Sequence, residues 1–134
     1  MKTCPYPLTP ADDAFGHHLG FIVEDAKNGY ARLRLNLEPY MINNLGTVHG
    51  GILATFCDEA SGVAVHTVCA MATTQNLNIH YLKGAKNTNF LIAEAKPLHC
   101  GKRSYLYEIN IYDDSGKHVT TATATYFILS QTNS

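Results

Sequence analysis

Apolar and polar residues follow two different periods along this chain. Between residues 50 and 70 nearly every position is apolar or small, which is typical of a helix buried on most of its sides. Before and after it, apolar residues alternate with polar ones, as at residues 30–37 and 105–111. That alternation is typical of half-buried strands. The pattern therefore predicts a sheet that curls around one long helix.

Turn signals divide the rest of the chain. Thr9-Pro10 looks like the cap and first residue of a short helix reaching about residue 17, and Asn28-Gly29 predicts a hairpin. Pro97 is expected to end its strand. We expect strands at residues 19–24 and 30–37, a helix at about 50–69, and then four strands in a meander, at residues 73–81, 90–96, 105–111 and 119–129.

The predicted class is α+β, with a six-stranded antiparallel sheet and a short N-terminal helix. We expect one domain over residues 1–134, with an extended arm at 1–10 and a polar tail at 130–134. A curled sheet covers only part of a helix that is apolar nearly all round. A second copy of the chain is therefore expected to complete the burial.

Composition narrows the function classes. The chain is 46% hydrophobic and 16% charged, with a net charge of −1 at pH 7, and a nucleic-acid binder normally carries a basic excess. No signal peptide or membrane-length apolar run is visible, so we expect a cytoplasmic protein without nucleic-acid or membrane partners. Four cysteines without a C-x-x-C pair fit reduced thiols, at Cys4, Cys57, Cys69 and Cys100.

The candidate chemistry lies where the central loop runs into the helix. The pair Gly50-Gly51 leaves backbone N–H groups bare at a helix start, where a ligand oxygen can approach. Asp58 follows two turns later, and a buried charge is costly unless something needs it. Eight residues along a helix span about 12 Å, yet both groups must come within about 3 Å of one reacting group. Two antiparallel helices of a dimer satisfy this requirement.

The motif Asn-x-x-Gly-x-x-His-Gly-Gly-(x)6-Asp, starting at Asn43 and placed before an apolar helix, resembles that of the hotdog-fold thioesterases. More narrowly, the chain is similar to the phenylacetate-pathway (PaaI-type) branch of acyl-CoA thioesterases, over roughly residues 15–129. The resemblance implies a hotdog fold, in which a highly curved antiparallel sheet wraps a central helix. It also implies homodimers, and commonly homotetramers.

The resemblance implies roles for individual residues. Asn43 would orient the loop and the reacting end of the substrate, and the Gly50 N–H would polarise the thioester carbonyl. Asp58 would be the catalytic carboxylate, as general base on water or as nucleophile. Thr74, with Thr73 beside it, matches the hydroxyl residue near the start of the following strand. In addition, His49 matches the motif histidine, for which a structural or positioning role is favoured over a general base.

Other residues are candidates for binding the substrate, and for some of them a structural role is the simpler explanation. Lys102 and Arg103, at a glycine turn, are candidates for the phosphates of coenzyme A, and Gly51 and Tyr81 for other substrate contacts. Tyr81 is also a candidate for lining the acyl pocket together with Tyr40, Met41 and Phe56, but core packing explains these residues equally well. We expect no metal, because His66 and Cys69 are too few ligands, and no cofactor apart from coenzyme A in the substrate. Simpler roles are expected for two neighbours of Asp58: burial for Cys57, and a solvated or salt-bridged state for Glu59, which is also the alternative catalytic carboxylate.

The expected function is hydrolysis of an acyl-CoA thioester to a free acid and coenzyme A. Two alternatives stay open. One is a non-catalytic acyl-CoA-binding module on the same fold. The other is an acyl-thioester dehydratase or hydratase, although the His-Phe-Pro and Asp-x-Asn-x-x-His motifs of those enzymes do not occur here.

Overall fold

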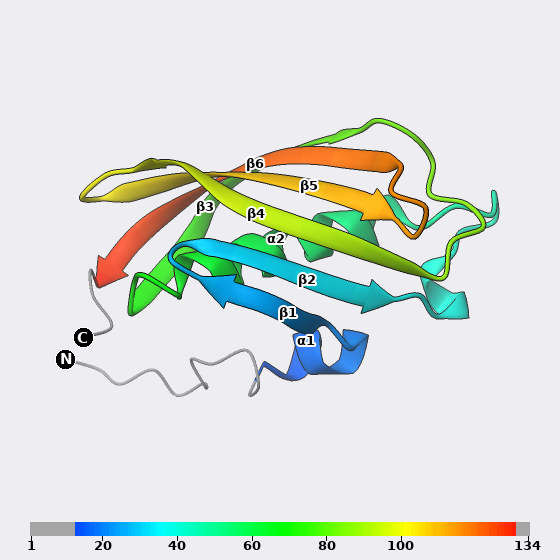
Figure 1. Cartoon of the computed structure of the whole chain (residues 1–134), viewed down its shortest axis with the longest axis horizontal. Coiled ribbons are helices and arrows are strands. Elements are labelled where there is room, and N and C mark those ends of the chain that lie inside the picture. Colours follow the sequence, from blue (N-terminus) through cyan, green and yellow to red (C-terminus); the bar gives the residue numbers. More distant parts are fainter. Residues whose placement is uncertain (1–12, 131–134) are drawn as a thin grey trace.

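The computed structural model describes residues 13–130. The expected arm and residues 131–134 of the expected tail lie outside the described residues, while Ser130 ends the last strand. Figure 1 shows the elements in chain order: α1 Ala14–Leu19, β1 Ile22–Lys27, β2 Tyr30–Asn36, η2 Pro39–Met41, α2 Gly50–Val65, β3 Met71–Tyr81, β4 Phe90–Cys100, β5 Ser104–Asp113 and β6 His118–Ser130.

The predicted hairpin joins β1 to β2. Asn28 and Gly29 both have positive φ, 54° and 83°, and a two-residue turn of this kind matches the twist of the strands it joins. The alternation in β2 also has its expected result, because Leu33 and Leu35 are fully buried. Local sequence therefore determines this part of the fold.

The predicted meander is wrong in one respect. The sheet order is β1-β2-β4-β5-β6-β3, so β3 pairs with β6 at one edge and β4 pairs with β2. Only β4, β5 and β6 follow one another as a meander. Alternation fixes which face of a strand is buried but not which strand lies beside it. As a result, β3 is an edge strand eleven residues long.

The central helix is shorter than expected, because α2 ends at Val65 rather than near residue 69. Polar side chains bind the carbonyl groups of its last turn. The Thr67 hydroxyl donates to the Ala64 carbonyl at 2.7 Å and accepts from the Gly29 N–H at 2.7 Å. The His66 ring contacts the Gly62 carbonyl through Nδ1 at 2.7 Å. Such local bonds compete with continuation of a helix.

Pro97 does not end its strand, because β4 continues to Cys100. The pairing of β4 with β2 extends only to Ala95, and the register with β5 shifts between Pro97 and His99. A proline is tolerated at such an irregularity, where the ladder does not need its missing N–H.

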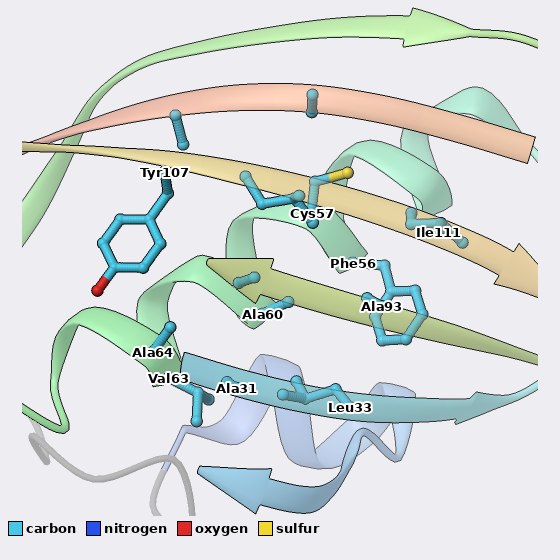
Figure 2. Packing of buried hydrophobic residues seen from close by; sticks show 14 of the residues in the cluster. Ala31, Leu33, Phe56, Cys57, Ala60, Val63, Ala64, Ala93, Tyr107 and Ile111 are labelled. Atoms are coloured by element: carbon cyan, nitrogen blue, oxygen red, sulfur yellow. The ribbon is translucent and has the colours of Figure 1, made fainter. Parts of the chain in front are cut away.

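The core lies between α2 and the concave face of the sheet. The helix contacts all six strands, and Figure 2 shows Phe56, Cys57 and Ala60 pointing toward the sheet. Small residues on the strands let the helix approach closely, among them the buried Ala93, Ala122 and Ala124. The predicted six-stranded antiparallel sheet curled around one main helix, with a short N-terminal helix, is confirmed. Within residues 13–130, neither helix is long and apolar enough to cross a bilayer.

Candidate active site

The loop before α2 is shaped by Asn43. Its side-chain oxygen accepts hydrogen bonds from the Leu45 N–H at 2.9 Å and from the N–H and hydroxyl of Thr47, both at 3.1 Å. The Asn43 N–H in turn donates to the Thr47 carbonyl at 2.8 Å. A short amide side chain that binds its own turn in this way stabilises a compact loop. The loop delivers the chain to the start of α2.

Gly50 is the first residue of α2, so its N–H has no acceptor one turn earlier in the helix. His49, the N-cap residue, is exposed, and its side chain makes no capping hydrogen bond. The Tyr81 hydroxyl donates to the Gly50 carbonyl at 2.8 Å, and a Cβ on Gly50 would lie 3.2 Å from that ring. Only a glycine fits comfortably here, and its N–H adds to the positive end of the helix dipole.

A cavity of about 310 Å³ lies beside Gly50. Loop and strand residues line it together, among them Asn43, Thr47, Leu53 and Tyr81. The predicted residues Asn43, Gly50 and Tyr81 are therefore brought to one place. Gly51 is the exposed second residue of the same helix.

Asp58 lies two turns further along α2. The Thr74 hydroxyl on β3 donates to Asp58 Oδ1 at 2.7 Å, at a position open to solvent. Thr73 is exposed beside Thr74, and neighbouring residues of a strand point to opposite faces. The structure therefore brings Asp58 and Thr74 together, whereas Thr73 does not share that contact.

Two residues behind Asp58 were missed by sequence reasoning. The hydroxyl of Tyr126 on β6 lies 3.0 Å from the Asp58 carbonyl oxygen, 3.4 Å from Asp58 Oδ1 and 2.8 Å from Ser61 Oγ. The Ser61 hydroxyl donates to the Cys57 carbonyl at 2.9 Å. Burial and the charge of Asp58 raise the pKa of Tyr126, so its hydroxyl stays a donor. The sequence did contain a signal for Tyr126. It lies on the same face of β6 as the small residues Ala122 and Ala124, where a large side chain is unusual.

The other flank of the same helix turn carries Glu59. The expectation that this side chain is solvated or salt-bridged is wrong. It is half-buried, and burial together with a hydrogen bond to the Asp13 carboxyl raises its pKa to about 8. Its neighbour is thus a second acid rather than a cation, and Glu59 holds a proton at neutral pH.

The remaining candidates lie apart from these groups. Cys57 is fully buried, and burial raises the pKa of its thiol to about 12, so it is a poor nucleophile. Cys57, Cys69 and Cys100 are free thiols, and residues 13–130 contain no cluster of three or more potential metal ligands. Lys102 and Arg103 are exposed on the β4–β5 hairpin, at the opposite end of the molecule from the start of α2 (Figure 1).

Comparison with known proteins decides the family. Residues 45–120, more than half of the chain, match the Thioesterase superfamily. The chain belongs to this superfamily. A Halobacterium salinarum protein, provisionally named as an esterase, is 39% identical over 69% of this chain and 66% of its own length. The acyl-coenzyme A thioesterase PaaI of Escherichia coli K12 is 27% identical over 81% of this chain and 77% of its own length.

Solved structures support the hotdog fold of this superfamily member. The E. coli PaaI protein matches it with a TM-score of 0.85, at 24% identity, over 91% of this chain and 88% of that one. A hypothetical thioesterase protein of Streptococcus pneumoniae TIGR4, solved with coenzyme A, matches with a TM-score of 0.80 at 27% identity, over 85% and 89% of the two chains. Variants of that protein have also been solved, one with an aspartate and one with a threonine changed to alanine, and those two positions are sixteen residues apart. Asp58 and Thr74 have the same separation here.

Proposed function

We propose that this protein hydrolyses acyl-CoA thioesters, with Asp58 as the catalytic carboxylate. The observation that carries the proposal is the half-buried Asp58 carboxylate held by the exposed Thr74 hydroxyl at 2.7 Å, in a chain of the Thioesterase superfamily. The nature of the substrate is supported by the relative named as an acyl-coenzyme A thioesterase and by the neighbour solved with coenzyme A. The reaction needs no group beyond water and the coenzyme A of the substrate.

Asp58 has two chemical routes to the same products. As a general base it takes a proton from water, and the water oxygen attacks the thioester carbon. As a nucleophile it attacks that carbon itself, giving an anhydride that water then opens. In both routes the C–S bond breaks, and coenzyme A leaves as a thiolate that takes up a proton. Within residues 13–130 the hydrogen bonds to the carboxylate both reach Oδ1, which leaves Oδ2 for the water or the thioester.

The carbonyl oxygen becomes negative in either route and needs a donor. We assign this role to the Gly50 N–H, at the positive end of α2. Asn43 holds the preceding loop, and His49 positions it through its backbone, since the His49 N–H donates to the Met41 carbonyl at 2.8 Å. The Tyr81 hydroxyl fixes the Gly50 peptide, and Gly51 keeps the approach to the helix open.

Gly50 and Asp58 of one chain are too far apart to act on one thioester, because eight residues of helix span about 12 Å. The edge strand β3 offers a solution. Thr74, near its start, contacts Asp58, and Tyr81, at its end, contacts Gly50. Antiparallel pairing of β3 with a second copy about a two-fold axis brings the Asp58 end of one chain to the Gly50 end of the other. We therefore propose a homodimer with two shared sites, and a homotetramer as its further assembly.

We propose that Lys102 and Arg103 bind the phosphates of coenzyme A. These two side chains are the exposed cations of the β4–β5 hairpin. They lie far from Gly50 of their own chain (Figure 1). In a shared site they would therefore bind the phosphates of the coenzyme A whose thioester lies beside Asp58 of the same chain.

Mixed dimers test both the hydrolysis and the shared site, with free-thiol release from a panel of acyl-CoA thioesters as the readout. One subunit carries Asp58→Asn, and the other carries Gly50→Leu, whose added side chain meets Tyr81. Each homodimer is expected to be inactive. The heterodimer retains one intact site, so it should recover about half of the wild-type activity, since one of its two sites is complete.

Circular dichroism and size-exclusion chromatography show that each variant folds and that heterodimers form. If heterodimers form without recovering activity, Gly50 and Asp58 act within one subunit or are not the catalytic pair. If the wild-type protein releases no thiol from any member of the panel, the assignment as a thioesterase fails. Binding of acyl-CoA without turnover would favour a non-catalytic module.

A further inference from the structure

The outer face of the sheet carries exposed apolar side chains at one end of the molecule, where the β4–β5 hairpin lies beside the end of β6 (Figure 1). Leu98 and Leu129 are each 55% exposed, and Phe127 is 41% exposed. The half-buried Leu106 lies on β5, between the strands that carry the others. We call these four residues the outer cluster. Scattered apolar residues are ordinary on a protein surface, whereas a contiguous group indicates an interaction site.

The residues of the outer cluster on β6 point away from the core. Tyr126 and Ile128 belong to the buried core. Phe127 and Leu129 alternate with them along β6, and successive side chains of a strand point to opposite faces. Phe127 and Leu129 therefore lie on the side of the sheet opposite α2.

The register places the other two residues next to them. Leu106 pairs with Thr125, which is two residues from Phe127 and shares its face. On β4 the partner of Leu106 is His99, and Leu98 lies beside it, where the register shifts. The four apolar side chains are thus neighbours across three strands.

Arg103 lies at the rim of the outer cluster. Its carbonyl accepts a hydrogen bond from the Ile128 N–H at 2.8 Å, which fixes the turn of the hairpin next to the end of β6. The Arg103 side chain is exposed, and among residues 13–130 no acidic group forms an ion pair with it. Its charge is therefore available to a partner.

The other charges near the outer cluster have the same sign. Residues 95–107 contain Lys96, Lys102 and Arg103 and no acidic residue, and β6 contains no acidic residue either. The next acid along β5 is Glu108, which is half-buried and lies opposite Lys96 in the ladder. The surface is therefore apolar at its centre and positive at its edge.

This combination of charge and apolar area decides which partner fits. A second copy placed here about a two-fold axis would bring the same cations together, and like charges in contact repel. A bilayer with anionic lipids instead offers phosphate groups to the cations and an apolar boundary to the large side chains. Each cation held near such a surface adds to the attraction.

We propose that the outer cluster and the cations around it dock this protein on the surface of an anionic lipid bilayer. The docking is peripheral, since side chains enter the interface and the chain does not cross it. The expectation of no membrane partner rested on the absence of a membrane-length apolar run, which bears on spanning alone. The inference does not depend on the thioesterase function proposed above.

The test is co-sedimentation of the full chain with lipid vesicles, made of phosphatidylcholine alone or mixed with the anionic phosphatidylglycerol. We expect binding to the mixed vesicles that weakens with added salt, and much weaker binding to phosphatidylcholine alone. Phe127→Ser combined with Leu129→Ser should lower the affinity for mixed vesicles by about tenfold or more, because two large apolar side chains no longer leave water. Ile22→Ser, at a residue 45% exposed on β1, is the matched control and should bind like the wild type.

A charge variant tests the rim of the outer cluster. Arg103→Glu reverses one charge next to the bilayer and should weaken binding to the mixed vesicles by about tenfold. Lys86→Glu reverses an exposed charge on the loop between β3 and β4, and it should leave vesicle binding unchanged. Because Arg103 is also proposed to bind coenzyme A, vesicle binding is measured without coenzyme A and apart from hydrolysis.

Circular dichroism and sedimentation velocity give the fold and the oligomeric state of each variant. If the double variant does not fold, Leu98→Ser takes its place, with an expected loss of affinity of about threefold. No binding of the wild type to mixed vesicles, or equal binding by the wild type and the cluster variant, would overturn the proposal. A cluster variant that forms a smaller oligomer, together with a wild type that ignores vesicles, would overturn it in favour of a second copy on this surface.

Discussion

Two neighbouring carboxyl groups on one turn of α2 have opposite environments. Asp58 faces a row of hydroxyl donors, with Thr74 at 2.7 Å and Tyr126 at 3.4 Å from Oδ1. Glu59 faces an apolar cavity and the carboxyl of Asp13, which raise its pKa to about 8. Donors favour a charged carboxylate, whereas apolar walls and a second acid favour a neutral one. The comparison shows how one helix can present a base on one flank and an acid on the other.

The largest expected effect is on kcat, and it distinguishes Asp58 from Glu59. Asp58→Asn keeps the shape of the side chain but removes the charge, so kcat should fall by about 10²–10⁴-fold, the usual contribution of a general base. Glu59→Gln should lower kcat far less, because its side chain points away from the thioester. Steady-state thiol release with purified variants measures both. Equal losses in the two variants would contradict the division of roles.

A smaller effect is expected behind Asp58. Tyr126→Phe removes a donor next to the carboxylate and should lower kcat by up to about tenfold with little change in KM, since a neutral hydrogen bond contributes roughly 0.5–1.5 kcal/mol.

The chain provides a matched control for this change. Tyr107 is also fully buried, its ring packs edge-on against Tyr126, and its hydroxyl has no hydrogen-bond acceptor or donor among residues 13–130. Tyr107→Phe should therefore leave kcat unchanged and keep or raise the melting temperature. If the two variants behave alike in kcat, Tyr126 is only a packing residue.

A further expected effect is on stability and depends on pH. The pKa of Glu59 is raised in the folded chain to about 8, so between the unfolded pKa, about 4.3, and pH 8 the folded state binds more protons than the unfolded state. Stability conferred by this group is then lost as the pH rises across that window. Glu59→Gln removes this pH-dependent loss of stability. The melting temperature of the variant minus that of the wild type should therefore increase from pH 5 to about pH 8 and then level off. A difference that is constant with pH would show that Glu59 is not buried as a neutral acid.

Local patterns were sufficient to predict most elements, whereas the candidate site residues came largely from the resemblance to the hotdog-fold thioesterases. The alternation of Leu33 and Leu35, the turn at Asn28-Gly29 and the glycine pair before an apolar run each depend on neighbours in sequence. The spacing of Asp58 from Gly50 also led directly to the hypothesis of a shared site. These features are set by backbone geometry that a short stretch of chain determines.

The features that were missed depend on long-range contacts. The position of β3 beside β6 follows from pairing across about fifty residues, and no periodicity encodes it. The end of α2 at Val65 depends on the Thr67 hydroxyl binding a hairpin 38 residues away. Tyr126 reaches Asp58 across 68 residues, and Asp13, the acidic neighbour of Glu59, is the N-cap residue of α1. The sequence therefore supplied Asp58 and its partner Thr74 as candidates, but not Tyr126 and Ser61 behind them.

The edge strand β3 also has a consequence for the behaviour of the chain in the cell. Its eleven residues, Met71–Tyr81, include no lysine, arginine, aspartate, glutamate or proline, which are the residues that usually protect an edge from unwanted pairing. While β3 is uncovered, it is therefore a template for any extended segment nearby. In the proposed homodimer β3 of each chain is covered by the other, so slow assembly after synthesis would favour aggregation over the proposed dimer.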